Sequence, residues 1–225
     1  MSVFDEVTII LVCYNSEDLI KRNLDEIKKF QTVIIDNSDS KQTFNLIKDF
    51  SNITYIGNKN NIGYGLACNL GVHHAKTPYI MILNPDILIN SLSIEILYKT
   101  YSNYDNVGIL VPGLYDESKN RRSNGSISHF KKNKCSNKVL FKSNNLAEGN
   151  TCYDFAVGCA YFMNKSFFKS IGGFSKSFFM YFEDNELCDR VYINNKTVIE
   201  VPSSKMVHMQ GLSSKKNFII DCKLS

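Results

Sequence analysis

The sequence lacks any apolar run long enough to cross a lipid bilayer. Its longest apolar stretches, such as "VTIILVCY" and "YIMIL", fall far short of the roughly 20 residues that a membrane-spanning helix needs. The start, "MSVFDEVTIILVCYN", also lacks the basic region and the small-residue cleavage site of a secretory signal peptide. We therefore expect a globular protein that stays in the cytoplasm.

Paired cysteines and a strong net charge are missing as well. The seven cysteines form no C-x-x-C pair, which argues against a disulfide framework and a structural zinc site, so most should be small core residues. A net charge of +4 is too small by itself to indicate nucleic acid binding. For the basic clusters "KNRR" and "HFKKNKCSNK" we favour a solvated loop over a patch for anionic lipid or substrate phosphate.

Two common nucleotide-binding signatures are also absent. In "NKNNIGYGLACNLGV" the spacing of Gly63, Gly65 and Gly71 fits neither G-x-G-x-x-G nor the P-loop. A hydride-transfer enzyme and a P-loop ATPase are therefore disfavoured. What remains is a glycine-containing loop that runs into a helix N-terminus, where backbone N–H groups can approach a nucleotide.

Short β-branched strands and helices alternate through the first half of the sequence. Strands are expected at "VTIILVCYN", "TVIIDNSD", "ITYIG", "YIMIL" and "VGILVPGLY", and helices at "SEDLIKRNLDEIKKF", "SKQTFNLIKDF", "GLACNLGVHHAK" and "SLSIEILYKTY". Ser16 is placed to cap the first helix. This alternation predicts βαβ units and a mainly parallel sheet, in one α/β domain that spans residues 1–225.

Polar residues follow four of these strands. They are Tyr14 and Asn15, Asp36 and Asn37, Asn58, and Asn84 with Asp86. Each alone is ordinary turn chemistry. Ligands of parallel sheets bind beyond the carboxyl ends of the strands, however, and one of these groups interrupts the apolar run "MILNPDILIN". Together they predict a polar site at one edge of the sheet.

The second half opens with residues 116–150, which are polar and without periodicity. We interpret them as a long surface loop or a pair of weak hairpins. A strand "YDFAVGCAYFMN", a short helix "KSFFKSIG" and a helix within "FFMYFEDNELCDRVYINN" should follow. The aromatic residues of this last stretch can stack on a sugar ring, but we favour a core cluster.

Two roles are open for Asp184, a carboxylate of the last predicted helix. It lies on the apolar face of that helix, whereas Glu183, Glu186 and Arg190 lie toward another face, where Glu186 and Arg190 can pair. Asp184 either balances the helix dipole or takes a proton from a substrate hydroxyl, and the sequence favours neither.

Asp86 and His208 each have two possible interpretations as well. Asp86 either opens a turn or is a hard oxygen ligand for Mg²⁺ or Mn²⁺. His208, in "KMVHMQGLSS", could be a second ligand, although a lone histidine is more often structural.

Seven segments in order resemble inverting family-2 glycosyltransferases of the bacterial rhamnosyltransferase-like group. They span Thr8 to Ser214 and read "TIILVCYNSEDLI", "VIIDNSDS", "NKNNIGYGLACNLGV", "MILNPDI", "GCAYFMNKSFFKSIGGF", "FFMYFEDNELCDRV" and "VHMQGLSS". The resemblance implies a GT-A fold, Rossmann-like, with a mostly parallel central sheet flanked by helices. It also implies a single-displacement reaction with a nucleotide-diphosphate sugar as donor, a divalent metal (Mn²⁺ or Mg²⁺), and a glycan or polyprenyl-diphosphate-linked acceptor.

The resemblance also implies a role for each matching residue. Tyr14, Asn15 and Asp36 would line the nucleoside pocket; Asn61, Gly63 and Asn69 would shape the donor pocket; Asn84 would contact the donor; Asp86 and His208 would bind the metal; Gly158, Cys159 and Glu183 would border the sugar and acceptor; and Asp184 would be the catalytic base. Residues 1–115 would bind the nucleotide sugar, 116–150 would be a variable loop, and 151–225 would carry the acceptor and catalytic half. Asn84 replaces an Asp of many relatives, which implies weaker metal dependence.

Several alternatives stay open. The leading hypothesis is an enzyme of bacterial surface polysaccharide synthesis that uses a dTDP- or UDP-linked sugar such as rhamnose. A sugar-nucleotide pyrophosphorylase would open on a glycine-rich basic loop, which "LVCYNSEDL" is not. A catalytically degenerate scaffold protein would need no base at Asp184. For the tail "KKNFIIDCKLS" we favour a packed terminal segment over contact with an anionic membrane.

Overall fold

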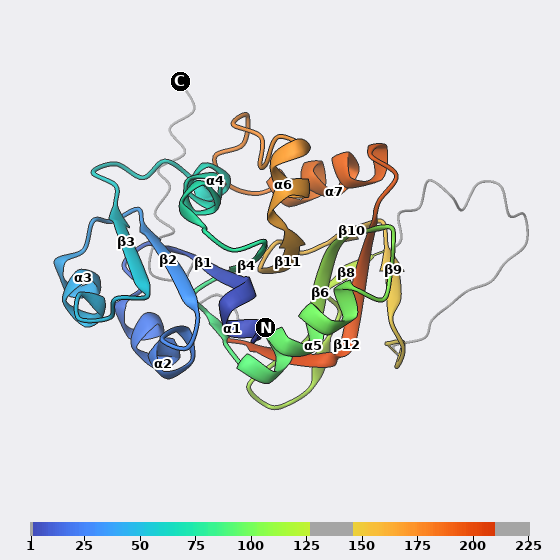
Figure 1. Cartoon of the computed structure of the whole chain (residues 1–225), viewed down its shortest axis with the longest axis horizontal. Coiled ribbons are helices and arrows are strands. Elements are labelled where there is room, and N and C mark those ends of the chain that lie inside the picture. Colours follow the sequence, from blue (N-terminus) through green and yellow to red (C-terminus); the bar gives the residue numbers. More distant parts are fainter. Residues whose placement is uncertain (1, 127–145, 210–225) are drawn as a thin grey trace, which may run out of the picture.

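A central mixed sheet with helices on both faces forms the body of the protein (Figure 1). The computed structural model describes residues 2–126 and 146–209. The strands on the main path run in the order β3 (Ile53–Gly57), β2 (Gln31–Asp36), β1 (Val7–Cys13), β4 (Tyr79–Leu83), β11 (Ala160–Asn164), β6 (Val107–Tyr115), β12 (Thr197–His208), β5 (Ile87–Leu88). The expected α/β class is confirmed.

Strand direction divides this sheet into parallel and antiparallel parts. Strands β3, β2, β1 and β4 are parallel to one another, as the βαβ pattern predicts. Strand β11 runs antiparallel between β4 and β6, and β12 is again parallel to β6. The sheet is therefore mixed in its second half, because β11 runs in the opposite direction between β4 and β6.

Alternate residues of the strands supply two cores, one on each face of the sheet. Ile9 and Leu11 face α2 (Glu17–Ile27), α3 (Lys41–Ile47) and α5 (Ser91–Tyr101), which lie below the sheet in Figure 1. Ile10 and Val12 face α4 (Tyr64–His74), α6 (Lys165–Ser170) and α7 (Glu183–Ile193) on the opposite side. Because successive side chains of a strand point to opposite faces of the sheet, β1 contacts both layers of helices.

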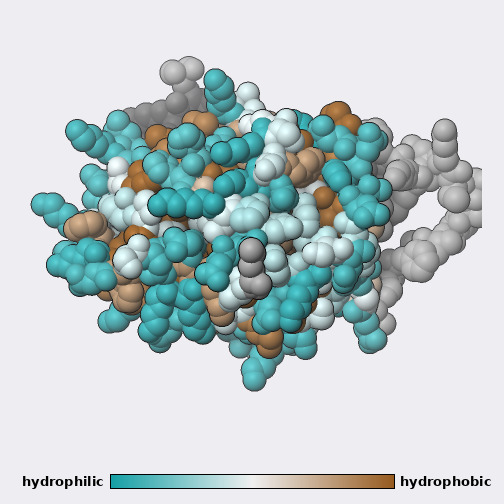
Figure 2. All heavy atoms as spheres, viewed as in Figure 1, coloured by the Kyte–Doolittle hydropathy of each residue, from teal (hydrophilic) through white to brown (hydrophobic). Residues whose placement is uncertain are grey.

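Five shorter elements complete the described structure. They are helix α1 (Val3–Glu6) and strands β7 (Arg121–Arg122), β8 (Gly125–Ser126), β9 (Thr151–Tyr153) and β10 (Phe155–Ala156). Strands β6 and β7 form a hairpin, so the predicted loop at 116–150 begins as one of the expected hairpins. Residues 127–145 and the tail "KKNFIIDCKLS" lie outside the described residues. The space-filling view shows a largely hydrophilic face with scattered apolar residues (Figure 2).

Most expected elements are confirmed, with three corrections. The predicted strand at 153–164 is divided among β9, β10 and β11, because these segments pair with different strands: β9 with β12, β10 with β8, and β11 with β4 and β6. The first helix ends at Ile27 rather than Phe30. Ser16 lies at its N-cap position, but its hydroxyl donates to the Tyr14 carbonyl (2.9 Å) and caps nothing.

Four of the five cysteines in the described part of the chain are buried, as expected for small core residues. Cys13, Cys68, Cys159 and Cys188 are buried free thiols, and Cys152 is exposed. Within residues 2–126 and 146–209, none of the helices has the length and apolarity that a membrane crossing requires.

Candidate active site

The carboxyl ends of the parallel strands bring the predicted polar residues to one edge of the sheet. The loops after β1 and β2 are joined by a bond from the Asn15 N–H to the Ser38 hydroxyl (3.1 Å). The loops after β2 and β3 are joined by a bond from the Asn58 amide to the Asn37 side-chain oxygen (2.8 Å). Tyr14 is partly exposed beside them. The prediction that these strand ends share one edge is correct.

Asp36 is fully buried, and its carboxylate serves its own loop. One oxygen accepts from the N–H (2.9 Å) and the hydroxyl (2.5 Å) of Ser38. The other accepts from the Ser40 N–H (3.2 Å) and the Tyr55 hydroxyl (3.3 Å). These bonds use the acceptor capacity of a carboxylate. Asp36 therefore shapes the loop around the expected nucleoside pocket, and direct contact with a nucleoside stays a prediction.

Gly63 is required where the glycine loop enters α4. Its φ of 85° is a left-handed conformation, and a Cβ there would lie 2.4 Å from the Phe179 carbonyl oxygen. Its N–H donates to the Asn61 side chain (2.9 Å), and the next amide, that of Tyr64, donates to the Phe179 carbonyl (3.0 Å). Both N–H groups thus have partners within the protein. The bond between Tyr64 and Phe179 also joins the glycine loop to the segment before α7.

Asn69 lies deeper along α4 and bridges two elements. Its amide donates to the Phe174 carbonyl (2.8 Å), and its oxygen accepts from the Phe174 N–H (2.8 Å). It fixes the turn after α6 against α4. The structure gives it this supporting position, and its contribution to a donor pocket stays a prediction.

The segment "NPD" closes the end of β4 against strand β11. The Asn84 N–H donates to the Cys159 carbonyl (2.9 Å), while the Asn84 side-chain oxygen is buried without a partner in the described part of the chain. The Asp86 side chain is 1% exposed, and its Oδ1 lies 3.4 Å from Nε2 of His208, at the end of β12. Residues that are 122 positions apart in the chain thus meet as the resemblance implied.

A divalent metal fits this pair. Two ligands of one octahedral ion with bonds near 2.1 Å are about 3.0 Å apart, close to the separation of Asp86 and His208. Carboxylate oxygen and imidazole nitrogen are both suitable donors for Mn²⁺. Within the described ranges no group of three or more His, Cys, Asp or Glu side chains is arranged to hold a metal ion, and Mg²⁺ in such sites is commonly bound by one or two carboxylates together with substrate phosphates and water.

Asp184 is held by Gly158, the residue before Cys159. Its Oδ2 accepts from the Gly158 N–H (3.1 Å), and a Cβ on Gly158 would lie 2.9 Å from the Asp184 Cβ. Burial, the Asp86 carboxylate and, to a smaller extent, the Asp184 carboxylate raise the pKa of the Cys159 thiol to about 12. Asn84, two residues before Asp86, also donates to the Cys159 carbonyl, so the segments that carry the expected metal ligand and the expected base are both bonded to the pair Gly158–Cys159.

Glu183 is buried, contrary to the face predicted for it. Only 6% of it is exposed, and its Oε2 has no partner among the described residues. Burial, with the neighbouring Asp184 carboxylate, raises its pKa. Helical periodicity failed here because Glu183 is the first residue of α7, under α4, where its position depends on the preceding turn. The predicted pair of Glu186 and Arg190 is confirmed, with bonds of 2.5 and 2.6 Å.

The aromatic segment, residues 178–182, is largely outside the core, contrary to the interpretation that we favoured. Phe179, Tyr181 and Phe182 are exposed, and Phe182 is 68% exposed. Tyr181 and Phe182 both have positive φ, a strained conformation for bulky residues. An exposed aromatic surface therefore lies directly before α7, the helix that carries Asp184.

Tyr64 is a site residue that the sequence did not single out. Its hydroxyl donates to the Gly158 carbonyl (2.9 Å), so α4 fixes the same residue whose N–H holds Asp184. The signal was its place next to Gly63 at the start of α4. A tyrosine in that position has too many structural roles for sequence reasoning to select this one.

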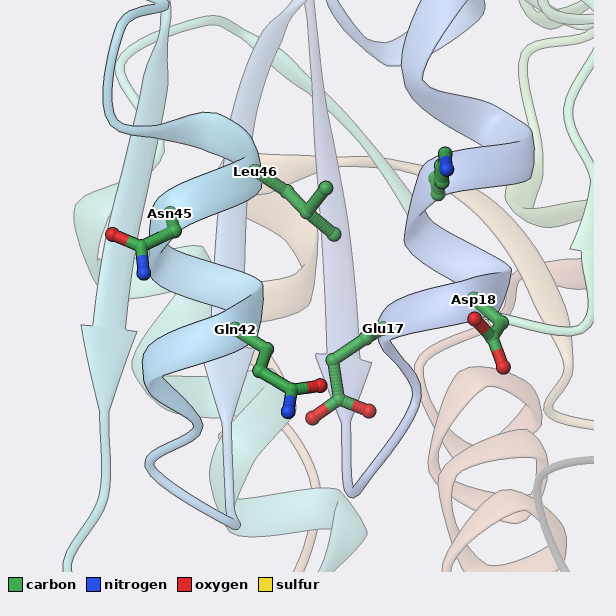
Figure 3. Close-up of a pocket in the computed structure, with 6 residues that line it drawn as sticks. Glu17, Asp18, Gln42, Asn45 and Leu46 are labelled. Carbon is green, nitrogen blue, oxygen red and sulfur yellow. The ribbon is translucent and has the colours of Figure 1, made fainter.

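A pocket between α2 and α3 is separate from the candidate site (Figure 3). It measures about 370 Å³ and contains none of the predicted site residues. Glu17 and Asp18 line it, with Lys21 as the basic residue. Its acidic wall is unfavourable for a diphosphate, so we do not assign the donor to it.

Two family models match the chain. Residues 8–171 match the model described as glycosyl transferase family 2, which is most of the chain. The chain belongs to this family. Residues 140–212 also match the N-terminal domain of galactosyltransferase. The resemblance noted in the sequence is thereby confirmed, and the protein is a family-2 glycosyltransferase.

Similar proteins include glycan-building enzymes. The chain is 27% identical to a low-salt glycan biosynthesis hexosyltransferase of Haloferax volcanii, over 96% of this chain and 71% of the relative. It is 23% identical to the rhamnosyltransferase WbbL of Escherichia coli, over 90% of this chain and 83% of the relative.

Solved structures support the GT-A fold. A mannosyltransferase from Pyrobaculum calidifontis, in complex with GDP-Man and Mn²⁺, matches with a TM-score of 0.63 at 16% identity. The match covers 90% of this chain and 56% of that one. S. aureus TarS in complex with UDP-GlcNAc matches with a TM-score of 0.64 at 14% identity, over 91% of this chain and 60% of that one. The chain thus spans little more than half the length of these structures.

Proposed function

We propose that the protein transfers a sugar from a nucleotide-diphosphate donor to a hydroxyl of a glycan or a polyprenyl-diphosphate-linked acceptor, with inversion. The observation that supports this proposal is that Asp86 lies 3.4 Å from His208 at the end of β4, while Asp184 accepts from Gly158, the neighbour of the residue whose carbonyl bonds Asn84. Two functional groups are needed in such a displacement, one at the leaving group and one at the nucleophile, and this site offers both. The relatives' roles in glycan synthesis support surface polysaccharide synthesis as the context.

Asp184 would act on the acceptor side. As the acceptor oxygen forms its bond to the anomeric carbon, its proton passes to the Asp184 carboxylate, and the bond from carbon to the phosphate oxygen breaks. The electron pair of that bond leaves with the nucleoside diphosphate. The Gly158 N–H holds Oδ2 of Asp184 in place, so the carboxylate needs little reorientation during the step.

Asp86 and His208 would hold the metal against the diphosphate, and Asn84 would offer its unpaired side-chain oxygen nearby. A divalent ion there supplies neutralisation of the charge that develops on the leaving diphosphate. Asn84 brings no charge of its own, so we propose that metal binding is weaker than in relatives with an aspartate at this position.

The acceptor would lie over the aromatic segment. Aromatic rings present an apolar face to the C–H groups of a sugar, and Phe179, Tyr181 and Phe182 are exposed beside Asp184. Gly158, Cys159 and Glu183 would border the same space from below. For the donor we propose a dTDP- or UDP-linked sugar, with dTDP-rhamnose as the first to test.

Thermal melting with UDP, dTDP and GDP, each with and without Mn²⁺, tests the donor site. A ligand at 100 times its Kd stabilises the folded state by about 2.7 kcal/mol, which corresponds to a rise in Tm of about 5–10 °C for a chain of this size. We expect such a rise with one nucleotide, dependent on Mn²⁺ and lost in Asp86→Ala and His208→Ala. His73→Ala, at the exposed end of α4, is the matched control. A folded protein that responds to none of the nucleotides would favour the scaffold reading.

A further inference from the structure

The short segment that joins β4 to β5 has backbone N–H and C=O groups that need hydrogen-bond partners. Strand β4 ends at Leu83, and the short strand β5 lies at the end of the sheet order, where β12 is its one partner among the described strands. The groups on its other side face α2. Buried backbone groups without partners cost free energy, so something on α2 has to bond them.

One side chain of α2 supplies these bonds. Nδ2 of Asn23 donates to the carbonyls of Pro85 (3.2 Å) and Ile87 (2.9 Å). Oδ1 of Asn23 accepts from the N–H of Ile89 (2.9 Å). Its amide bonds the carbonyl of one residue and the N–H two positions later, as a neighbouring strand would. Asn23 is 2% exposed and is the polar member of the buried face of α2.

Asp86 lies between the two carbonyls that Asn23 bonds. Its own carbonyl accepts from the Met209 N–H (2.9 Å), and its carboxylate faces His208. The Asp86 segment is therefore held by α2 on one side and by the end of β12 on the other. A shift of Pro85 or Ile87 would move the carboxylate away from His208.

We propose that Asn23 is a positioning residue for the metal ligand Asp86, which rests on the proposed function of the site. Asn23 touches neither metal nor donor. It fixes the backbone on both sides of Asp86, so that the carboxylate is presented to the metal in one geometry. Replacing a residue that orients a metal ligand without touching the metal typically lowers metal affinity 10- to 100-fold.

A purely structural asparagine in the same protein provides the matched control. Nδ2 of Asn52 donates to the carbonyls of Lys28 (2.8 Å) and Phe30 (2.6 Å), at the turn between α2 and β2. Asn52 also satisfies two backbone carbonyls with its side-chain amide, but at the opposite end of α2 from the strand ends of the site. Its loss should lower Tm without a change in the response to metal.

The experiment is a Mn²⁺ titration of the nucleotide-induced rise in Tm, with full-length wild type, Asn23→Ala, Asn23→Ser and Asn52→Ala. The measured quantity is the Mn²⁺ concentration at half of the maximal rise. We expect at least a 10-fold increase for both Asn23 variants and an unchanged value for Asn52→Ala. Because each variant is compared with its own metal-free midpoint, a loss of stability alone does not move this quantity.

The outcomes separate this proposal from the proposed function. A wild type without a Mn²⁺-dependent response overturns the metal site itself. A wild type that responds, with Asn23 variants that respond at the same Mn²⁺ concentration, overturns the role of Asn23 alone. An equal shift in Asn52→Ala, or failure of both Asn23 variants to fold, also overturns it, because the effect would then be one of general stability.

Discussion

Replacing Gly158 with alanine should displace Asp184 without straining the backbone. The φ of Gly158 lies outside the left-handed region, so the effect of a methyl group there is one of space alone. The added Cβ would lie 2.9 Å from the Asp184 Cβ, whereas carbon atoms in good contact are about 3.5 Å apart. One of the two residues must therefore move by about 0.6 Å.

The cost can be stated for stability and for activity. Overpacking of this kind costs about 1–3 kcal/mol, which lowers Tm by roughly 2–12 °C in a chain of this length. A displacement of about 1 Å at a catalytic group can reduce the rate 100-fold. We expect Gly158→Ala to lower kcat at least 10-fold with little change in nucleotide binding, because Asp86 and His208 are not displaced.

Chemical denaturation and release of the nucleoside diphosphate from a responsive donor measure the two effects. Gly149→Ala is the control, because a Cβ at Gly149 would meet nothing within 4 Å. Asp184→Ala keeps the offending Cβ, so only Asp184→Gly should relieve the clash. The loss in Gly158→Ala/Asp184→Gly should therefore be smaller than the sum of the single losses. Strict additivity of the free energies of unfolding would refute the reasoning.

Two further predictions concern buried carboxyl groups. Because the pKa of Glu183 is raised in the folded protein, stability falls as pH rises from the ordinary value near 4.5 through the folded pKa, and Glu183→Gln should remove this part of the fall in denaturation curves between pH 4 and 8; an unchanged pH profile would contradict it. Glu200 is fully buried and accepts from Arg121 (2.9 Å) and Tyr153 (2.7 Å), so Arg121→Ala should cost about 3–5 kcal/mol in urea unfolding. The exposed pair of Lys99 and Glu95 is the control, expected to contribute under 1 kcal/mol.

Periodicity and strand-end chemistry predicted much of the fold and the site. The strands at 53–57, 79–83 and 107–115 and the helix at 91–101 have the expected bounds. Each of these elements follows one regular period along its whole length, so its bounds can be predicted without knowledge of its partners. The predicted strand at 153–164 failed because its residues pair first with β12, then with β8, and last with β4 and β6, and no local pattern records such changes of partner.

The sequence by itself determined that parallel strands would gather Asp36, Asn84 and Asp86 at one edge, because consecutive βαβ units leave no other direction for the strand ends. Only the tertiary structure decided which of these groups are available to a ligand. Asp36 is used by its own loop, whereas Asp86 meets His208. It also decided that Asn23 would support the Asp86 segment, because a helix side chain can replace a missing strand only where packing brings the two together.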